Sequence, residues 1–106
     1  MARALINVPA TAKKGEAVEI KVLIQHPMET GFRTGPDGKL VPRDIIQRFS
    51  CTYDGQEVFA AELHPAVAAN PFFAFFTLAT ASGPLIFKWT DNAGKEESQS
   101  ADIAVT

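Results

Sequence analysis

Residues 18–25 read Val18-Glu19-Ile20-Lys21-Val22-Leu23-Ile24-Gln25, and their side chains alternate with a period of two. The β-branched residues at positions 18, 20, 22 and 24 fall on one face of an extended chain, while Glu19, Lys21 and Gln25 fall on the other. This alternation is typical of a half-buried β-strand. The stretch therefore predicts an all-β fold.

Further segments of the chain carry strand signals of the same kind. In order, they are residues 5–8, 49–53, 58–63, 72–80, 85–90 and 98–105. Asp54-Gly55 stands between two of these segments and is a strong hairpin signal. About seven short strands separated by Gly, Pro and Asp turns predict an immunoglobulin-like antiparallel β-sandwich. We expect one domain that covers residues 1–106.

The composition excludes several classes of function. The 106 residues suffice for one hydrophobic core, and a formal net charge of −2 gives no electrostatic basis for general nucleic-acid binding. No apolar run approaches the roughly 20 residues that a membrane span needs. The N-terminus has no apolar segment of signal-peptide length. Read literally, this places the chain in the cytoplasm, unless a partner that carries a signal exports it.

Residues 72–78, Phe-Phe-Ala-Phe-Phe-Thr-Leu, do not alternate between apolar and polar side chains. Phe72, Phe76 and Leu78 share one face, and Phe73 and Phe75 share the other. A strand of a two-layer sandwich has one face toward solvent, so the second apolar face must be covered. The cover is either the chain's own loop 26–48 or another protein. A chain this small has little spare length, which favours a protein interface and self-association of the chain when it is alone.

A loop of roughly twenty residues follows 18–25, and a loop that long in a small domain is usually functional. It opens with His26-Pro27-Met28-Glu29-Thr30-Gly31-Phe32-Arg33 and continues through Pro42-Arg43-Asp44. Asp37-Gly38 predicts a tight turn, so the loop should fold into a small hairpin of its own. Its interleaved Arg and acidic residues are either solvated or form a polar surface on which Arg contacts a partner's carboxylate or another anionic group.

Catalytic and metal-binding roles find little support. His26 and His64 are the only histidines, and Cys51, the only cysteine, is predicted to be a buried residue between Phe49 and Tyr53. A copper site of the cupredoxin type needs a Cys, two His and usually a Met, with most of these on one loop. Here Cys51 and His64 lie on opposite strands of a hairpin. We expect no catalytic residue, no metal and no cofactor; the alternatives are a small copper or other electron-transfer protein, or a thiol enzyme with a reactive Cys51.

Five segments carry a resemblance to a known family. They are 20–33 with its run His26-Pro27-Met28-Glu29-Thr30-Gly31, 42–46 (Pro-Arg-Asp-Ile-Ile), 49–55 (Phe-Ser-Cys-Thr-Tyr-Asp-Gly), 69–72 (Ala-Asn-Pro-Phe) and 87–94 (Phe-Lys-Trp-Thr-Asp-Asn-Ala-Gly). Together they span nearly the whole chain, which resembles the SoxZ family, the smaller subunit of the SoxYZ carrier complex of bacterial thiosulfate oxidation. The resemblance implies an immunoglobulin-like sandwich in a heterodimer with a SoxY-like subunit.

In that family the SoxY-like subunit carries the pathway intermediates on a cysteine in a flexible Gly-Gly-Cys-Gly-Gly C-terminal arm. This chain ends Ala101-Asp102-Ile103-Ala104-Val105-Thr106 without such an arm, so we expect it to be the subunit that does not carry them. The resemblance also implies periplasmic residence by co-export with the signal-bearing partner.

Residue roles follow from the patterning of the chain within that complex. We expect Phe73 and Phe75 to form the interface with the SoxY-like subunit. For transient docking of the Sox enzymes, or for shaping the space around the carrier arm, we expect a recognition loop made of His26, Met28, Glu29, Thr30, Gly31, Phe32, Arg33 and Arg43.

Overall fold

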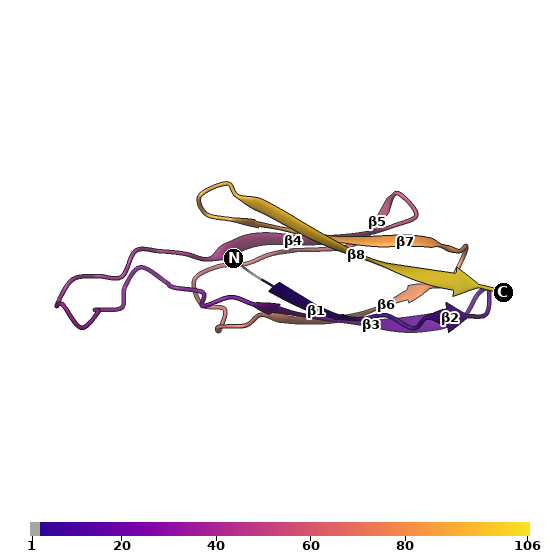
Figure 1. Ribbon diagram of the computed structural model, residues 1–106, viewed down its shortest axis with the longest axis horizontal. Coiled ribbons are helices and arrows are strands. Elements are labelled where there is room, and N and C mark those ends of the chain that lie inside the picture. Colours follow the sequence, from indigo (N-terminus) through magenta and orange to yellow (C-terminus); the bar gives the residue numbers. More distant parts are fainter. Residues whose placement is uncertain (1–2) are drawn as a thin grey trace.

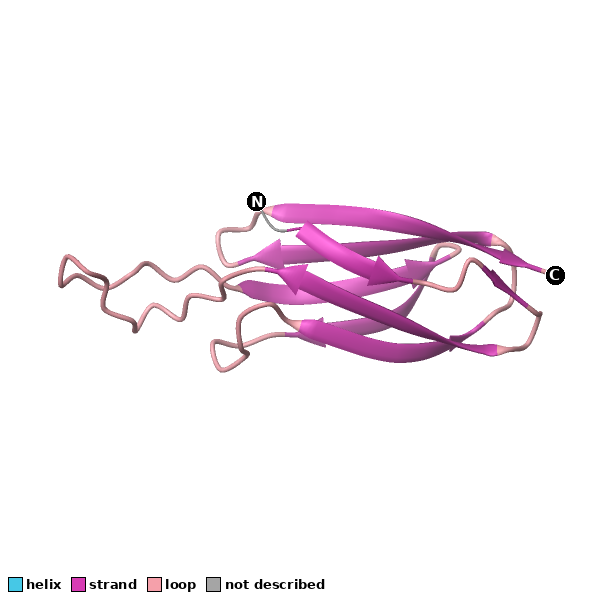
Figure 2. Ribbon diagram, turned by 60° about the horizontal axis from the view of Figure 1, so that its bottom comes forward, coloured by secondary structure: helices cyan, strands magenta, loops and turns pink. Residues whose placement is uncertain are grey.

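A computed structural model describes residues 3–106, which contain eight β-strands and no helix (Figure 2). The strands are β1 (Arg3–Asn7), β2 (Thr11–Ala12), β3 (Ala17–Gln25), β4 (Ile46–Tyr53), β5 (Gln56–Glu62), β6 (Phe72–Leu78), β7 (Gly83–Asp91) and β8 (Glu96–Val105). The all-β prediction is therefore confirmed.

The strands form two sheets that pack face to face (Figure 1). One sheet has three strands in the order β1-β3-β6, and the other has five in the order β2-β8-β7-β4-β5. The pairings are antiparallel, except that β2 runs parallel to β8. This arrangement is the immunoglobulin-like sandwich that the sequence predicts.

Strand β3 lies in the middle of the three-stranded sheet, and only one of its faces is covered by the other sheet. Its inward residues Val18, Ile20, Val22 and Ile24 are buried, whereas Glu19 and Lys21 point to the outside, where their side chains form a 3.5 Å ion pair. The sequence alternates because one face of this strand packs on the core and the other face is exposed.

The Asp54-Gly55 turn is found where the sequence places it. Asp54 and Gly55 connect β4 to β5 with positive φ angles of 50° and 83°. The turn from β7 to β8 is closed by a 3.0 Å bond from the Gly94 N–H to the Asp91 carbonyl. The short strand β2 has no counterpart among the predicted strands, because two residues show no periodicity.

The structure corrects the expected orientation of β6. Phe73 and Phe75 point into the sandwich: the Phe73 ring stacks on Phe49 with centroids 4.3 Å apart, and Phe75 stacks on Phe59 at 4.4 Å. Phe75 is only 8% exposed. The prediction that Phe73 and Phe75 form the partner interface is therefore wrong.

The reason lies in the register of the sheet. Phe73 is paired with Val22 and Phe75 with Ile20, both of which belong to the buried row of β3. Residues directly opposite each other in an antiparallel pair share a face, so the odd-numbered phenylalanines join the core. The even-numbered row of β6 is left on the outside.

Candidate functional site

Between β3 and β4 the chain forms a hairpin extension (residues 26–45) that projects beyond the end of the sandwich (Figures 1 and 2). With it, the molecule is 57 Å long and 19 Å across. Glu29 and Asp44 pair the two branches near the base through N–H···O bonds of 2.8 and 2.9 Å. Thr34 and Leu40 form a second bridge next to the tip. The predicted small hairpin around Asp37-Gly38 is thus confirmed.

Two asparagines hold the hairpin extension at its base. Asn70, in the loop before β6, accepts the His26 N–H through Oδ1 at 3.1 Å and donates its own N–H to the His26 carbonyl at 2.8 Å. Asn92, in the turn after β7, forms the corresponding pair with Ile45 at 2.8 and 3.0 Å. Its Nδ2 also donates to the Arg43 carbonyl at 3.2 Å. Both branches therefore leave the sandwich with their backbone groups satisfied.

His26 and Met28 lie inside this base and are both buried. His26 Nδ1 accepts the Met28 N–H at 3.0 Å, while His26 Nε2 lies 3.3 Å from Asp44 Oδ1. Met28 adopts a φ of 51°, and its sulfur accepts the Ile46 N–H at 3.3 Å. These two members of the predicted recognition loop fix the shape of the extension and present little surface to a partner.

Glu29 and Arg33 form a two-point ion pair on one branch. Arg33 Nη2 donates to Glu29 Oε1 at 2.6 Å and Nε donates to Oε2 at 3.1 Å. The hydrogen bonds from Arg33 lower the pKa of the Glu29 carboxyl below its ordinary value, and the carboxylate raises the pKa of Arg33. The pair lies at the surface, so water and salt screen it.

Thr30, Gly31, Phe32 and Arg43 form a second cluster beside this pair. Arg43 Nε donates to the Thr30 carbonyl at 2.7 Å, and the Arg43 guanidinium lies 5.5 Å from the centroid of the Phe32 ring. Gly31 has a φ of 91°, and a Cβ there would stand 3.1 Å from Arg43 Cβ. The Phe32 ring is 74% exposed. An exposed aromatic ring beside a guanidinium is a combination enriched at the centres of protein interfaces.

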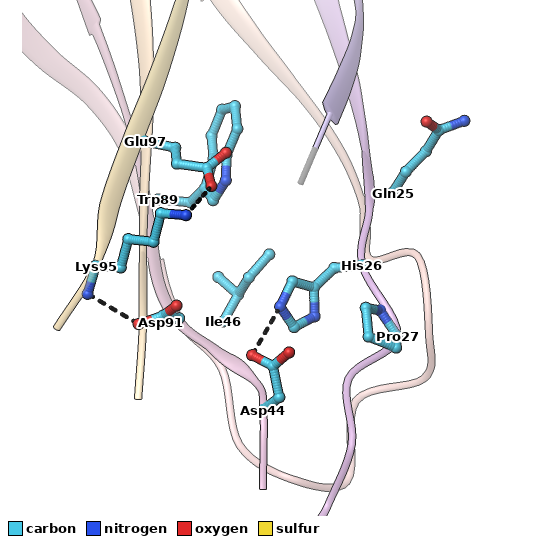
Figure 3. Close-up of a pocket in the computed structure, with 9 residues that line it drawn as sticks. All are labelled: Gln25, His26, Pro27, Asp44, Ile46, Trp89, Asp91, Lys95 and Glu97. Carbon is cyan, nitrogen blue, oxygen red and sulfur yellow. Dashed lines mark hydrogen bonds and ion pairs between the residues drawn. The ribbon is translucent and has the colours of Figure 1, made fainter. Parts of the chain in front are cut away.

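A cavity of about 250 Å³ opens at the base of the hairpin extension (Figure 3). Its lining residues are Gln25, His26, Pro27, Asp44, Ile46, Trp89, Asp91, Lys95 and Glu97. Lys95 Nζ lies 3.6 Å from Glu97 Oε1, and the Lys95 N–H donates to Asp91 Oδ1 at 2.9 Å. The Trp89 indole N–H is buried and has no acceptor within residues 3–106. None of the nine lining residues is a Ser, Thr or Cys, so the cavity wall places no hydroxyl or thiol beside His26.

The outer face of the three-stranded sheet carries exposed apolar side chains along β6, beside the Glu19–Lys21 ion pair of β3. Phe72, Phe76 and Leu78 of β6 are 57%, 67% and 57% exposed. Leu5 of β1, Leu23 of β3 and Phe72 lie side by side across the three strands and line a shallow depression of about 320 Å³. We call this surface the outer face.

The remaining candidates for chemistry do not come together. Cys51 is fully buried in β4, and burial raises the pKa of its thiol to about 12. The prediction of a buried, inward-facing cysteine is confirmed. His64 lines a different cavity from His26, and residues 3–106 contain no group of three His, Cys, Asp or Glu that could hold a metal ion. No helix in this part of the chain is long and apolar enough to cross a membrane.

Sequence reasoning singled out the residues on the hairpin extension but missed those that hold it. Asn70 and Asn92 appeared only within the segments that carry the family resemblance, although Asn before Pro and Asn after Asp are the kinds of residue that bond to neighbouring backbone. It also missed Leu5 and Leu23 of the outer face, because an isolated apolar residue on a polar strand face carries no signal of its own.

Solved structures with the same fold come from proteins of several kinds. A superoxide reductase (neelaredoxin) from Ignicoccus hospitalis matches with a TM-score of 0.72 at 16% identity, over 97% of this chain and 79% of that one. A putative superoxide reductase from Thermotoga maritima matches with a TM-score of 0.72 at 22% identity, over 97% and 85%. The sulfur carrier protein SoxY from Chlorobium limicola f thiosulfatophilum matches with a TM-score of 0.69 at 16% identity, over 97% and 78%. At these identities the likeness is one of fold.

The sequence itself gives a more specific result. No curated protein matches it. The family model described as "Sulphur oxidation protein SoxZ" matches residues 6–102, which is nearly the whole chain. The match includes the hairpin extension, both anchoring asparagines and all of β6. The chain therefore belongs to the SoxZ family of sulphur oxidation proteins.

Proposed function

We propose that this chain is the non-catalytic subunit of a SoxYZ-type carrier complex and pairs with a SoxY-like subunit that bears the sulfur intermediates. Family membership supports the complex, and the buried Cys51 supports the division of labour, because a thiol inside β4 has no access to a sulfur donor. We place the complex in the periplasm, reached by co-export. Cell fractionation with an antibody against this chain, in strains with and without the partner's signal peptide, tests that location.

The outer face is the surface that we assign to the SoxY-like subunit. This assignment rests on one observation: Phe72, Phe76 and Leu78 are each more than half exposed on a single strand. Removing a phenylalanine side chain from water stabilises a complex by roughly 2 kcal/mol, so an uncovered row of this kind favours association. The neighbouring Glu19–Lys21 ion pair adds a polar contact at the centre of the same surface.

A matched pair of substitutions tests the outer face. Phe76→Asp places a charge in the assigned interface and should weaken pairing with the SoxY-like subunit by about thirtyfold or more, which corresponds to roughly 2 kcal/mol. Phe32→Asp makes the same chemical change at a ring that is also largely exposed, but on the hairpin extension, and should leave pairing unchanged. Calorimetric titration of the two purified subunits measures both. Equal affinities for the two variants would refute the assignment.

The hairpin extension is the part that we assign to transient docking of the Sox enzymes. It projects away from the sandwich (Figure 1). Its internal contacts hold Phe32, Arg33 and Arg43 in fixed positions at its surface. A preorganised surface loses little conformational entropy on binding, which suits short encounters with several enzymes. The same position would let it limit the space open to the partner's carrier arm.

A reconstituted thiosulfate-oxidising system tests this second assignment. Replacing both Glu29 and Arg33 by Ala removes the ion pair and should leave the heterodimer intact while thiosulfate-dependent turnover falls. Replacing Glu57 and Arg48, an exposed pair on the five-stranded sheet, by Ala is the matched control. If the two double variants turn over at the same rate, the extension has a structural role only.

A further inference from the structure

Strand β6 forms an open edge of the three-stranded sheet. Among the described residues 3–106, it pairs with β3 on one side and has no strand on the other. The Ile24 N–H donates to the Pro71 carbonyl at 2.9 Å, which makes Ile24 and Pro71 a hydrogen-bonded pair. Such pairs alternate along an antiparallel ladder, so Phe73, Phe75 and Thr77 also direct their backbone groups toward β3.

The residues in between direct their backbone groups outward. These residues are Phe72, Ala74, Phe76 and Leu78, and all four are exposed. Within residues 3–106, no backbone bond from any of them to a loop or turn is present. Their side chains also form the β6 part of the outer face. Free hydrogen-bonding groups and apolar side chains thus belong to the same four residues.

The other sheet edges carry the features that prevent strand addition. Strand β1 is short and bears Arg3, while β2 has only two residues. Strand β5 bears Glu57 and Glu62, and a bulge interrupts its pairing with β4. Charged residues, short length and bulges are the usual protection of an edge strand. β6 has seven residues, no charge, no proline and a continuous register with β3.

From this contrast we infer that the edge of β6 pairs with an edge strand of the SoxY-like subunit, so that the three-stranded sheet continues into the partner. This inference rests on the proposed heterodimer and specifies how its interface is built. The partner strand bonds to the backbone of Phe72, Ala74, Phe76 and Leu78, and the side chains of the same residues pack against the partner on the outer face.

The choice of occupant follows from the chemistry of the edge and from the fold of the partner. An uncharged, apolar edge does not select an acidic or basic peptide; it fits a neutral extended strand. SoxY from Chlorobium limicola f thiosulfatophilum has the same sandwich fold, so a protein of its kind contains sheet edges that can be joined to this one. The edge is also continuous with the outer face, which is the surface already assigned to that subunit.

Two substitutions at one position separate edge pairing from packing on the face. Ala74→Pro removes an outward N–H without breaking a bond to β3, and proline is tolerated at such edge positions. It should weaken the affinity for the SoxY subunit of the same organism by about tenfold or more, as expected for one lost hydrogen bond and a clash with the added strand. Ala74→Val keeps the N–H at the same exposed site and should bind within a few-fold of the parent chain. Circular dichroism of the isolated variants checks their fold.

Hydrogen exchange of the unmodified complex provides a test that needs no substitution. In the isolated chain the amides of Ala74, Phe76 and Leu78 should exchange fast, and those of Phe73, Phe75 and Thr77 slowly. Addition of SoxY should slow the first group and leave the second unchanged. The inference would be overturned if Ala74→Pro bound normally and the amides of Ala74, Phe76 and Leu78 still exchanged fast in the complex. In that case the proposed heterodimer would still stand if Phe76→Asp disrupted pairing. Protection that grows with the concentration of the chain alone, and that SoxY does not alter, would also overturn it by assigning the edge to a second copy.

Discussion

The side-chain amide of Asn92 occupies the place of a strand neighbour to Ile45. Asn92 Oδ1 accepts the Ile45 N–H at 2.8 Å, and the Asn92 N–H donates to the Ile45 carbonyl at 3.0 Å. Ile45 is almost fully buried, so neither of these groups can turn to water instead. One residue of the β7–β8 turn thus completes the hydrogen bonding of the branch that returns from the hairpin extension.

Asn92→Ala should destabilise the protein by about 1–3 kcal/mol, because it leaves the buried Ile45 N–H without an acceptor. Urea denaturation followed by circular dichroism measures the change in the free energy of unfolding. Asn7→Ala is the matched control, since the Asn7 side chain is exposed and makes no hydrogen bond within residues 3–106; it should stay within about 0.5 kcal/mol. Similar losses in both variants would contradict the anchoring role.

Gly31→Ala should cost more stability than Gly38→Ala. Both glycines have a positive φ, of 91° and 79°, which is unfavourable for alanine by roughly 1 kcal/mol. A Cβ at Gly31 would also stand 3.1 Å from Arg43 Cβ, whereas one at Gly38 would meet no atom of the described residues within 4 Å. The added contact should displace Arg43 from the Thr30 carbonyl. Thermal unfolding midpoints rank the stability of the two variants. Equal midpoints would show that the extension adjusts to a Cβ at Gly31 without loss of stability.

The Glu29 carboxyl should titrate below its ordinary pKa, because the hydrogen bonds from Arg33 favour its charged form. A lowered pKa means that the ion pair is fully formed above the ordinary value and is lost as the pH falls through the lowered one. Carbon-detected NMR of the Glu29 carboxyl measures this midpoint. Arg33→Gln should raise it toward the ordinary value, and Arg48→Gln, in a separate ion pair, should not move it.

Cys51 should resist thiol reagents in the native protein. Burial raises the pKa of its thiol to about 12, so the reactive thiolate is nearly absent at pH 8, and the surrounding core excludes the reagent. Labelling with a chromogenic disulfide should reach one thiol per chain only after denaturant is added. Fast stoichiometric labelling without denaturant would reopen a chemical role for this residue.

The strands other than β2 could be predicted because each has a run of strand-forming residues bounded by turn signals. Residues 18–25 alternate because one face of β3 meets the core, and Asp54-Gly55 marks a turn that few other pairs form as readily. The orientation of β6 could not be predicted in this way, since both of its rows are apolar. The register with β3 decides it, and that register is a long-range property which residues 72–78 do not contain.

The location of the candidate site could be predicted from the sequence, but the contacts that hold its residues in place could not. The length and residue types of 26–45 mark a recognition element, but they do not tell which side chains face out. His26 and Met28 are buried because Asn70, Asp44 and Ile46 close around them from other parts of the chain. Contacts of that kind become visible only when the two sheets are placed face to face.

The two branches of the hairpin extension start from different sheets. One continues β3 and is bonded to Asn70, next to β6; the other leads into β4 and is bonded to Asn92, next to β7. A small slide of one sheet over the other would therefore move the base of one branch relative to the base of the other. Because the tip is far from the base, it would tilt by a larger amount. The strand addition inferred at β6 would act only on the sheet whose branch is bonded to Asn70, so a changed tilt of the hairpin extension is the expected sign of an occupied edge.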